Sequence, residues 1–224
     1  MIGALKLIVF DLIGTTIQDN HEVPDTFSEA LADHDIRITA EQMRHARGAS
    51  KREALQQLIP PSPKQAELAE SVYASFRERL IRKFEAQPVR PVARADEIFQ
   101  WFRKHGVRVA LNTGFDREIT DLVIASSGWT NGVVDAVVCV EDVSKGRPEP
   151  FLILRAMEVT GISSVHEVAN VGDTAIDLHA GFNAGVRWNI GVLSGAHNRA
   201  MLEEAPHTHL LTSITELPSV FEGW

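Results

Sequence analysis

Polar residues that could carry chemistry directly follow several apolar runs of the sequence. Asp11 comes after the first run, and later runs lead to the segments Asn112-Thr113-Gly114, Gly146-Arg147-Pro148 and Gly172-Asp173-Thr174. A carboxylate such as Asp11 can act as a nucleophile toward phosphorus or carbon. Further carboxylates can hold a hard divalent cation, and hydroxyl, amide and guanidinium groups can bind the oxygens of an anionic group. These segments can act together only if the fold brings them to one place.

Five short apolar segments, each next to a stretch with helical periodicity, predict the elements that would position these residues. They span residues 5–10, 107–111, 136–140, 168–171 and 189–193. Continuous apolar runs of this length are typical of strands buried on both faces, and strands that alternate with helices indicate a parallel sheet. Ligands of open α/β sheets bind beyond the carboxyl ends of the strands. The sequence therefore predicts an α/β protein with its site at that edge of the sheet.

Residues 17–91 show no such apolar run and instead carry the apolar spacing of helices. Helical periodicity covers residues 26–33, 40–47, 51–58 and 64–84. Proline-rich stretches at 59–63 and 87–91 break helices and fit a loop inside this block and a return linker at its end. We predict a helical cap at 17–91, inserted into a core of residues 1–16 and 92–224, with hinges near Thr16 and Pro91.

Composition limits the partners and the location of the protein. The 224 residues have a net charge of -8, which argues against nucleic acid because its partners usually need a basic surface. No apolar run reaches the ~20 residues of a membrane helix and no signal segment is evident, so we expect a cytoplasmic protein that does not bind a membrane. The single cysteine, Cys139, cannot form an intramolecular disulfide and is expected to be buried in a strand. A monomer and a homodimer are equally compatible with the sequence.

The polar segments, taken in order, resemble the four motifs of the haloacid dehalogenase superfamily. The matching stretches are Asp11-Leu12-Ile13-Gly14-Thr15-Thr16, Thr113-Gly114, Gly146-Arg147-Pro148, and Val171-Gly172-Asp173-Thr174 with Asp177. Each stretch is weak evidence alone, since an aspartate after a strand is commonly a turn or cap residue. All four stretches occur in the expected order, however, and together they span nearly the whole chain. The resemblance implies a Rossmann-like, doubly wound parallel core with an inserted helical cap, and hydrolysis of a small phosphonate or phosphate substrate.

The resemblance also implies Mg2+ as cofactor and names its ligands. The metal is expected to be held by the Asp11 side chain, the backbone carbonyl of Ile13 and the Asp173 carboxylate, with Asp177 supporting these ligands. Asp11 is the expected nucleophile, and the aspartyl-phosphate that it forms splits one difficult displacement into two easier ones. A divalent cation suits this chemistry because an attacking carboxylate and a phosphoryl group repel each other.

Groups that bind the substrate follow from the same motifs. Thr113 and the amide of Gly114 are expected to donate hydrogen bonds to the transferring phosphoryl oxygens. Helix capping is the alternative for Thr113, because a helix is expected from Phe115 onward and threonine is a common N-cap. Gly14 and Thr15, in the loop that follows the nucleophile, are also expected to contact the substrate.

Arg147 stands where the superfamily usually has a lysine. A permanent positive charge there would keep the nucleophile ionised and would contact the phosphoryl oxygens. Lys145, two residues earlier, is the alternative candidate for this role.

Ile13 occupies the position where superfamily phosphatases generally carry a second aspartate, which protonates the leaving alkoxide and later activates water. Isoleucine has no titratable group. The phosphonoacetaldehyde hydrolase subgroup also lacks this aspartate, and there a cap lysine forms a Schiff base with the substrate aldehyde. The chain resembles that subgroup at Gly14-Thr15-Thr16, at Thr113-Gly114-Phe115 and at the cap segment Gly48-Ala49-Ser50-Lys51. The resemblance makes Lys51 the candidate Schiff-base residue and Gly48 a candidate substrate contact.

Two departures from the subgroup leave other roles open. Arg47 and Ala54 stand where the subgroup has a methionine and a histidine. Related sugar-phosphate enzymes carry a basic residue at the same cap spacing, so Lys51 is equally well interpreted as an electrostatic clamp in a phosphate monoester phosphatase. A catalytically weak binding or regulatory module is a further alternative. A metal-free dehalogenase fits less well, because the charge of Asp173 would disfavour attack by a neighbouring carboxylate.

Overall fold

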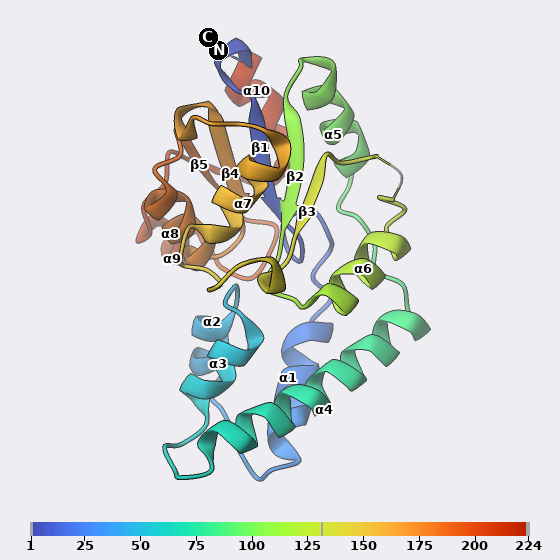
Figure 1. Cartoon of the computed structure of the whole chain (residues 1–224), viewed down its shortest axis with the longest axis vertical. Coiled ribbons are helices and arrows are strands. Elements are labelled where there is room, and N and C mark those ends of the chain that lie inside the picture. The colour runs from blue at the N-terminus through green and yellow to red at the C-terminus, as the bar shows by residue number, and fades with distance from the viewer. Residues whose placement is uncertain (1, 131, 223–224) are drawn as a thin grey trace.

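A six-stranded parallel sheet forms the centre of the computed structural model, which describes residues 2–130 and 132–222 (Figure 1). The strand order is β3-β2-β1-β4-β5-β6. The strands are β1 (Leu7–Asp11), β2 (Arg108–Asn112), β3 (Ala136–Val138), β4 (Val168–Gly172), β5 (Trp188–Val192) and β6 (His209–Leu211). The predicted parallel α/β fold and its five strands are confirmed, with ends that shift by one or two residues.

Strand β6 is the element that the sequence analysis missed. It has three residues, His209–Leu211, and all three are only partly buried at the edge of the sheet. Such a segment lacks the continuous apolar run by which the buried strands were recognised. The predicted strand at 136–140 is also shorter than expected, because the 3-10 helix η2 (Val140–Asp142) begins just after it.

Alternating side chains of β1 fill two cores on opposite faces of the sheet. Leu7 and Val9 pack with residues of α7 (Phe151–Thr160) and α8 (Ala175–Ala184). Ile8 and Phe10 pack with α5 (Ala95–Lys104) and α10 (Leu217–Glu222), and the rings of Phe10 and Phe99 lie 5.4 Å apart. Because successive side chains of a strand point to opposite faces, an uninterrupted apolar strand requires helices on both sides. The core is therefore doubly wound.

The remaining short elements complete the core. They are α6 (Arg117–Ser126), α9 (Arg199–Glu203) and the 3-10 helices η1 (Ile2–Ala4), η3 (Val165–Glu167) and η4 (Ile214–Glu216). The first and last described elements, η1 and α10, lie together at one end of the molecule, opposite the helices that follow β1 (Figure 1).

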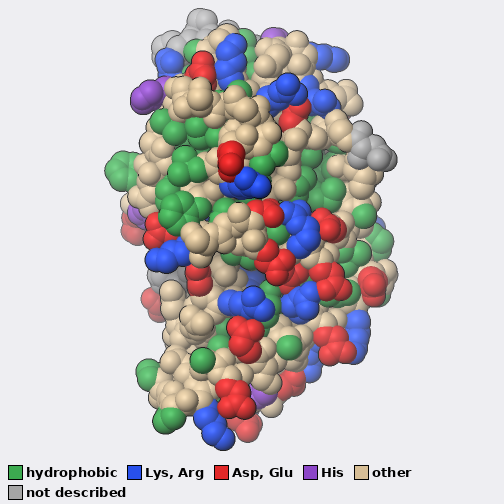
Figure 2. Space-filling model, viewed as in Figure 1, with side chains coloured by type: hydrophobic (Ala, Val, Ile, Leu, Met, Phe, Trp, Pro, Cys, Tyr) green, Lys and Arg blue, Asp and Glu red, His purple; other side chains and the backbone are tan. Residues whose placement is uncertain are grey.

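Four helices follow β1 and form a layer of their own beyond the carboxyl ends of the strands (Figure 1). They are α1 (Glu22–Ala32), α2 (Ala40–Ala46), α3 (Lys51–Leu58) and α4 (Gln65–Ala86), so the four predicted helices are confirmed. An aromatic contact between Phe27 and Phe76, with ring centroids 5.5 Å apart, packs α1 against α4. Figure 2 shows acidic and basic side chains close together over this part of the face. Among the described residues, no helix is both long and apolar enough to cross a membrane.

Two adjacent chain segments connect this helical layer to the core. The amide of Gln18 donates to the Arg90 carbonyl and the amide of Val92 donates to the Thr16 carbonyl, both at 2.9 Å. The two segments therefore run side by side where the hinges were expected. That residues 17–91 move there as one body stays a prediction.

A buried carboxylate, Asp116, links the helical layer to the core. It caps the N-terminus of α6, where its Oδ1 accepts from the Ile119 amide at 3.0 Å. Its Oδ2 accepts from the Tyr73 hydroxyl and from Arg77 Nε, each at 2.6 Å, and both of these residues belong to α4. Asp116 is only 4% exposed, so each donor depends on it for a partner.

We expect the substitution Asp116→Ala to lower the free energy of unfolding by about 2–4 kcal/mol, because it leaves the buried Tyr73 hydroxyl without an acceptor, removes one carboxylate partner of the partly exposed Arg77 and removes a helix cap. Urea denaturation followed by circular dichroism measures this change. The matched control is Glu118→Ala, which removes the other carboxylate partner of Arg77 at a site that is 63% exposed. That control should cost less than about 1 kcal/mol. Equal losses in the two variants would contradict the assignment.

Candidate active site

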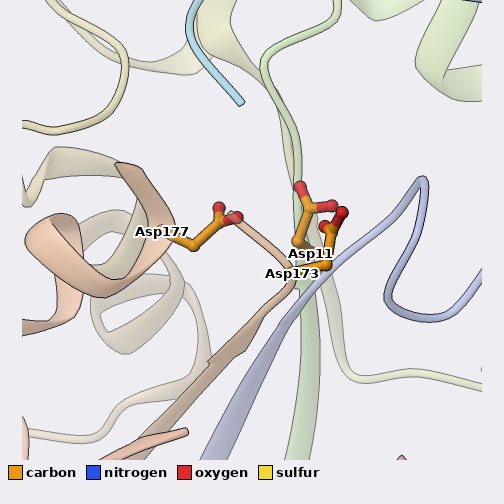
Figure 3. A group of neighbouring side chains, drawn as sticks. All are labelled: Asp11, Asp173 and Asp177. Carbon is orange, nitrogen blue, oxygen red and sulfur yellow. The ribbon is translucent and has the colours of Figure 1, made fainter. Parts of the chain in front are cut away.

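The carboxyl ends of β1, β2 and β4 bring the expected site residues together. β1 lies between β2 and β4, and Asp11 is the register partner of Asn112, while Phe10 is the partner of Val171. The residues that follow each strand therefore meet at one edge. Figure 3 shows the carboxyl groups of Asp11 and Asp173 next to each other, with Asp177 approaching from α8. One oxygen from each of the three lies within 4.8 Å of the others.

Arg147 joins two of these carboxylates. Its Nη1 donates to Asp11 Oδ1 at 2.6 Å and also to Asp177 Oδ1. The residue is 4% exposed, and its Nε is the buried side-chain donor without a partner among the described residues. Lys145, the alternative cation, is exposed. Of the two candidates, Arg147 therefore lies beside Asp11.

Asp173 is fixed by donors from two loops. Its Oδ1 accepts from the Thr15 hydroxyl at 3.1 Å, and its Oδ2 accepts from the Ala196 amide at 2.7 Å. Gly14 lies so close that an added Cβ would sit 2.3 Å from Asp173 Oδ2, and its φ of +96° is in the region that favours glycine. The glycine therefore lets the loop after β1 pass beside the carboxylate.

Asp177 serves the local structure as well as the site. Its side chain and that of Thr174 form a reciprocal capping box at the start of α8, in which Asp177 Oδ2 accepts from the Thr174 amide at 3.0 Å. With Arg147 on its other oxygen, Asp177 lies behind the guanidinium rather than at the front of the site. Its position fits the expected supporting role better than that of a direct ligand.

Burial gives the carboxylates unusual proton affinities. Desolvation raises the pKa of Asp11 from 3.8 to about 6, against the opposing effect of the Arg147 charge. Burial and the nearby charges of Asp11 and Asp177 hold the pKa of Asp173 well above its usual value. One guanidinium faces three carboxylates, so the fully ionised cluster would carry two excess negative charges. Such a cluster favours either a proton or a bound cation.

A cavity of about 50 Å³ opens above these carboxylates, between the core and the helical layer. The core side contributes Asp11, Ile13, Thr113, Gly114, Phe115, Arg147, Asp173 and Thr174, and the helical layer contributes Val23, Pro24, Phe27, Met43, Ala46, Arg47, Gly48 and Lys51. Most of the residues predicted from the sequence thus share one cavity. Gly14, Thr15 and Asp177 are not among the residues that line it.

The loop before α3 lies directly on the core loops. An added Cβ on Gly114 would be 2.9 Å from the Ala49 carbonyl oxygen. Gly48 has a φ of +83°, and its Cβ would lie 2.4 Å from Thr174 Oγ1. Only glycine allows these approaches, so the helical layer is closed over the site in this arrangement.

Lys51 extends from this loop into the cavity. Its Nζ donates to the Ala49 carbonyl at 3.1 Å and lies 5.7 Å from the centroid of the Phe115 ring. Burial, together with the charges of Arg147 and Arg47, lowers the pKa of Lys51 from 10.5 to about 8. The neutral form of the amine is therefore much more populated near neutral pH than it is in an ordinary lysine.

Thr113 lines the cavity and does not cap a helix. Helix α6 begins at Arg117, and its N-cap is Asp116. The Thr113 hydroxyl accepts from the Phe115 amide at 3.2 Å. The capping alternative is wrong because the helix starts two residues later than the sequence pattern suggested.

Sequence reasoning missed the loop after β5. In addition to the Ala196 amide on Asp173, the Ser194 hydroxyl donates to the Gly14 carbonyl at 2.8 Å. His197 is buried, its Nδ1 accepts from the Ala175 amide at 3.0 Å, and its Nε2 lies 3.1 Å from the Arg44 carbonyl of α2. The sequence did indicate where this loop lies, since it also follows a predicted strand at the same edge of the sheet.

Comparisons with known proteins identify the family of this chain. The family model for haloacid dehalogenase-like hydrolases matches residues 5–185. The chain belongs to this hydrolase family. A phosphonoacetaldehyde hydrolase of Bacillus cereus is 27% identical over 89% of this chain and 80% of its own length. A bifunctional phosphonoacetaldehyde hydrolase/aminoethylphosphonate transaminase of Clostridioides difficile is also 27% identical, but this chain spans only 33% of it.

A solved structure shows the same fold. It is a phosphonoacetaldehyde hydrolase-like protein from Oleispira antarctica, with a TM-score of 0.85 at 18% identity, covering 99% of this chain and 92% of that one. The superfamily resemblance seen in the sequence motifs is confirmed, and so is the resemblance to phosphonoacetaldehyde hydrolases.

We expect Asp11→Asn to stabilise the metal-free protein at pH 7.5. The pKa of Asp11 is raised to about 6 in the fold, so the folded state favours protonated Asp11 and loses stability as pH rises from about 4 through 6. Removing the charge should recover up to about 3 kcal/mol, which is several degrees in melting temperature. Thermal unfolding in a chelator measures it, and the gain should shrink toward pH 4. The matched control is Asp25→Asn at an exposed position, which should not raise the melting temperature. A destabilised Asp11→Asn protein would refute the assignment.

Proposed function

We propose that the chain is a Mg2+-dependent hydrolase that cleaves the phosphorus–carbon bond of a small phosphonoaldehyde. One observation carries this proposal: the amine of Lys51 shares a buried cavity with Asp11, while Ile13 offers no acid or base. A phosphatase needs a group to protonate its leaving alkoxide. A reaction through a Schiff base does not, because the departing carbon leaves as an enamine.

The carboxylate cluster fits a divalent cation. Three buried carboxylates with one guanidinium leave two excess negative charges, and hard oxygen ligands are those that Mg2+ prefers. Asp11, the Ile13 carbonyl and Asp173 would hold the ion, and Asp177 would keep Arg147 in place. When bound, the ion neutralises charge so that a carboxylate can approach a phosphoryl group.

The core side of the cavity is assigned to the phosphoryl group. The Asp11 carboxylate attacks phosphorus, and Thr113, the Gly114 amide and Arg147 donate to the phosphoryl oxygens. The unpaired Nε of buried Arg147 supports this assignment, because a phosphoryl oxygen would supply the missing acceptor. Gly14 and Thr15 then act on the substrate only indirectly, by holding Asp173.

Lys51 is assigned to the carbonyl group. The neutral amine adds to the aldehyde, and with one proton taken up from solvent the adduct loses water, which gives a protonated imine. Asp11 bonds to phosphorus as the phosphorus–carbon bond breaks, and the released electron pair moves into the imine to form an enamine. The enamine takes a proton on carbon and water releases the aldehyde from Lys51. A second water converts the aspartyl-phosphate to phosphate and restores Asp11.

Residues 17–91 are proposed to act as a cap that opens and closes at the paired segments near Thr16 and Pro91. Closure places Gly48 and Lys51 over the core and excludes water during phosphoryl transfer. The relatives named phosphonoacetaldehyde hydrolase support the proposed substrate class.

Hydrolysis of a phosphate monoester is the second candidate. It is favoured by the hydrogen bond from Lys51 Nζ to the Ala49 carbonyl and by the nearby Arg47, since two cations could clamp an anionic substrate. In a phosphate monoester hydrolase, Lys51 would act only through its positive charge. A variant that keeps the charge separates the two candidates.

We expect phosphate release from phosphonoacetaldehyde to require Mg2+ and to fall at least 100-fold in both Lys51→Ala and Lys51→Arg, whereas borohydride should trap a covalent adduct only on wild type. Asp11→Ala serves as the blank for release. The control for charge is Lys51→Arg, which cannot form an imine. If Lys51→Arg retained most of the activity, the Schiff base would be refuted and the clamp favoured.

We also expect the rate of borohydride trapping to rise about tenfold per pH unit up to pH about 8 and to level above it, because only the neutral amine adds to the aldehyde. The background from other lysines is measured on Lys51→Arg. A rate that kept rising to pH about 10 would mean that the pKa of Lys51 is not lowered.

A further inference from the structure

The two sides of the cavity differ in chemistry. The core side presents carboxylates, a guanidinium, a hydroxyl and backbone amides, whereas five of the residues on the side of the helical layer are apolar: Val23, Pro24, Phe27, Met43 and Ala46. The first three come from α1 and the other two from α2. We call these five residues the apolar wall.

The polar groups beside the apolar wall are few and already engaged. Arg47 is paired with Asp19, and both side chains are largely buried, at 15% and 7% exposure. Lys51 Nζ lies between the Ala49 carbonyl and the face of Phe115, which is itself 4% exposed. Lys51 is thus the group on this side placed to meet a carbonyl, and the remaining surface offers carbon atoms.

The proposed function places the phosphoryl group of the substrate at Asp11 and its carbonyl group at Lys51. The apolar wall then limits the substituents that the carbon between these two groups can carry. With phosphorus at Asp11 and the carbonyl at Lys51, the carbon that joins them would lie in the cavity that the apolar wall lines on the side of the helical layer. A hydroxyl placed there would lose its hydrogen bonds to water and gain none, which is costly in a buried site. A methyl group placed there would gain contact with carbon.

We infer that the substrate class is phosphonoaldehydes whose carbon next to phosphorus bears only hydrogen or a short alkyl group, and that the apolar wall rejects hydroxylated analogues. This inference rests on the proposed function and narrows it. The loop before α3 lies directly on the core loops across this cavity, which favours a short substituent over a long one.

The same wall separates this site from one that binds a sugar phosphate. Recognition of several hydroxyls needs donors and acceptors arranged around the organic part of the ligand, because each unpaired hydroxyl lowers affinity. The apolar wall supplies none from its side chains, since Val23, Pro24, Phe27, Met43 and Ala46 carry no hydrogen-bonding N or O atom beyond the backbone.

The experiment measures kcat/KM for three substrates: phosphonoacetaldehyde and its analogues with a methyl or a hydroxyl group on the carbon bonded to phosphorus. Phosphate release is followed with Mg2+ present. We expect wild type to favour the methyl over the hydroxyl analogue by at least about tenfold. Val23→Thr and Met43→Gln, which keep the side-chain size but add a polar group, should reduce this ratio severalfold or more.

The matched control is Val159→Thr, the same chemical change at a 52% exposed position of α7, which should leave the ratio unchanged. If the protein releases phosphate from phosphonoacetaldehyde but uses the hydroxyl analogue as well as or better than the methyl analogue, the inference is wrong and the proposed function stands. An unchanged ratio in both wall variants would also overturn it. No release from any of the three aldehydes by the folded protein would overturn phosphorus–carbon cleavage and the inference with it.

Discussion

The buried contact between Arg147 and the carboxylates of Asp11 and Asp177 is the interaction on which the site depends. One guanidinium cannot neutralise three ionised carboxylates, so this buried cluster carries excess negative charge unless it takes up a proton or a cation. Donors from separate loops, among them Thr15 and the Ala196 amide, hold the remaining carboxylate, Asp173, in place. The negative charge that destabilises the metal-free fold is the charge that the proposed cation would bind. The stability of the metal-free fold and the proposed metal binding are therefore opposed here.

The core cannot complete the proposed reaction by itself. Ile13 occupies the position from which an acid or base would act, and the titratable amine in the cavity, Lys51, belongs to the helical layer. Gly114 permits the loop before Lys51 to approach, because any side chain there would meet the Ala49 carbonyl. In the proposed mechanism, closure of the helical layer also assembles the site, so substrate binding and the start of chemistry are linked.

Local patterns in the sequence by themselves predict much of the fold. Continuous apolar runs predicted five of the strands, and apolar spacing predicted the helices between residues 17 and 91, because burial on two faces or on one stripe repeats along a short segment. The three-residue strand β6 has no such repeat and was missed. The sequence also determined which residue types reach the edge of the sheet, including Asp11, Arg147 and Asp173, and that position 13 has no acid or base.

The tertiary structure alone decided which of those groups meet. Local spacing could not tell that Arg147 rather than Lys145 pairs with Asp11, that Asp116 rather than Thr113 caps α6, or that the loop after β5 holds Asp173. Local spacing also did not indicate that apolar side chains of α1 and α2 line the cavity. The physical reason is that the type of an element follows from side chains a few residues apart in the sequence. Contacts between loops depend instead on how distant elements pack, and this packing leaves no periodic pattern in the sequence.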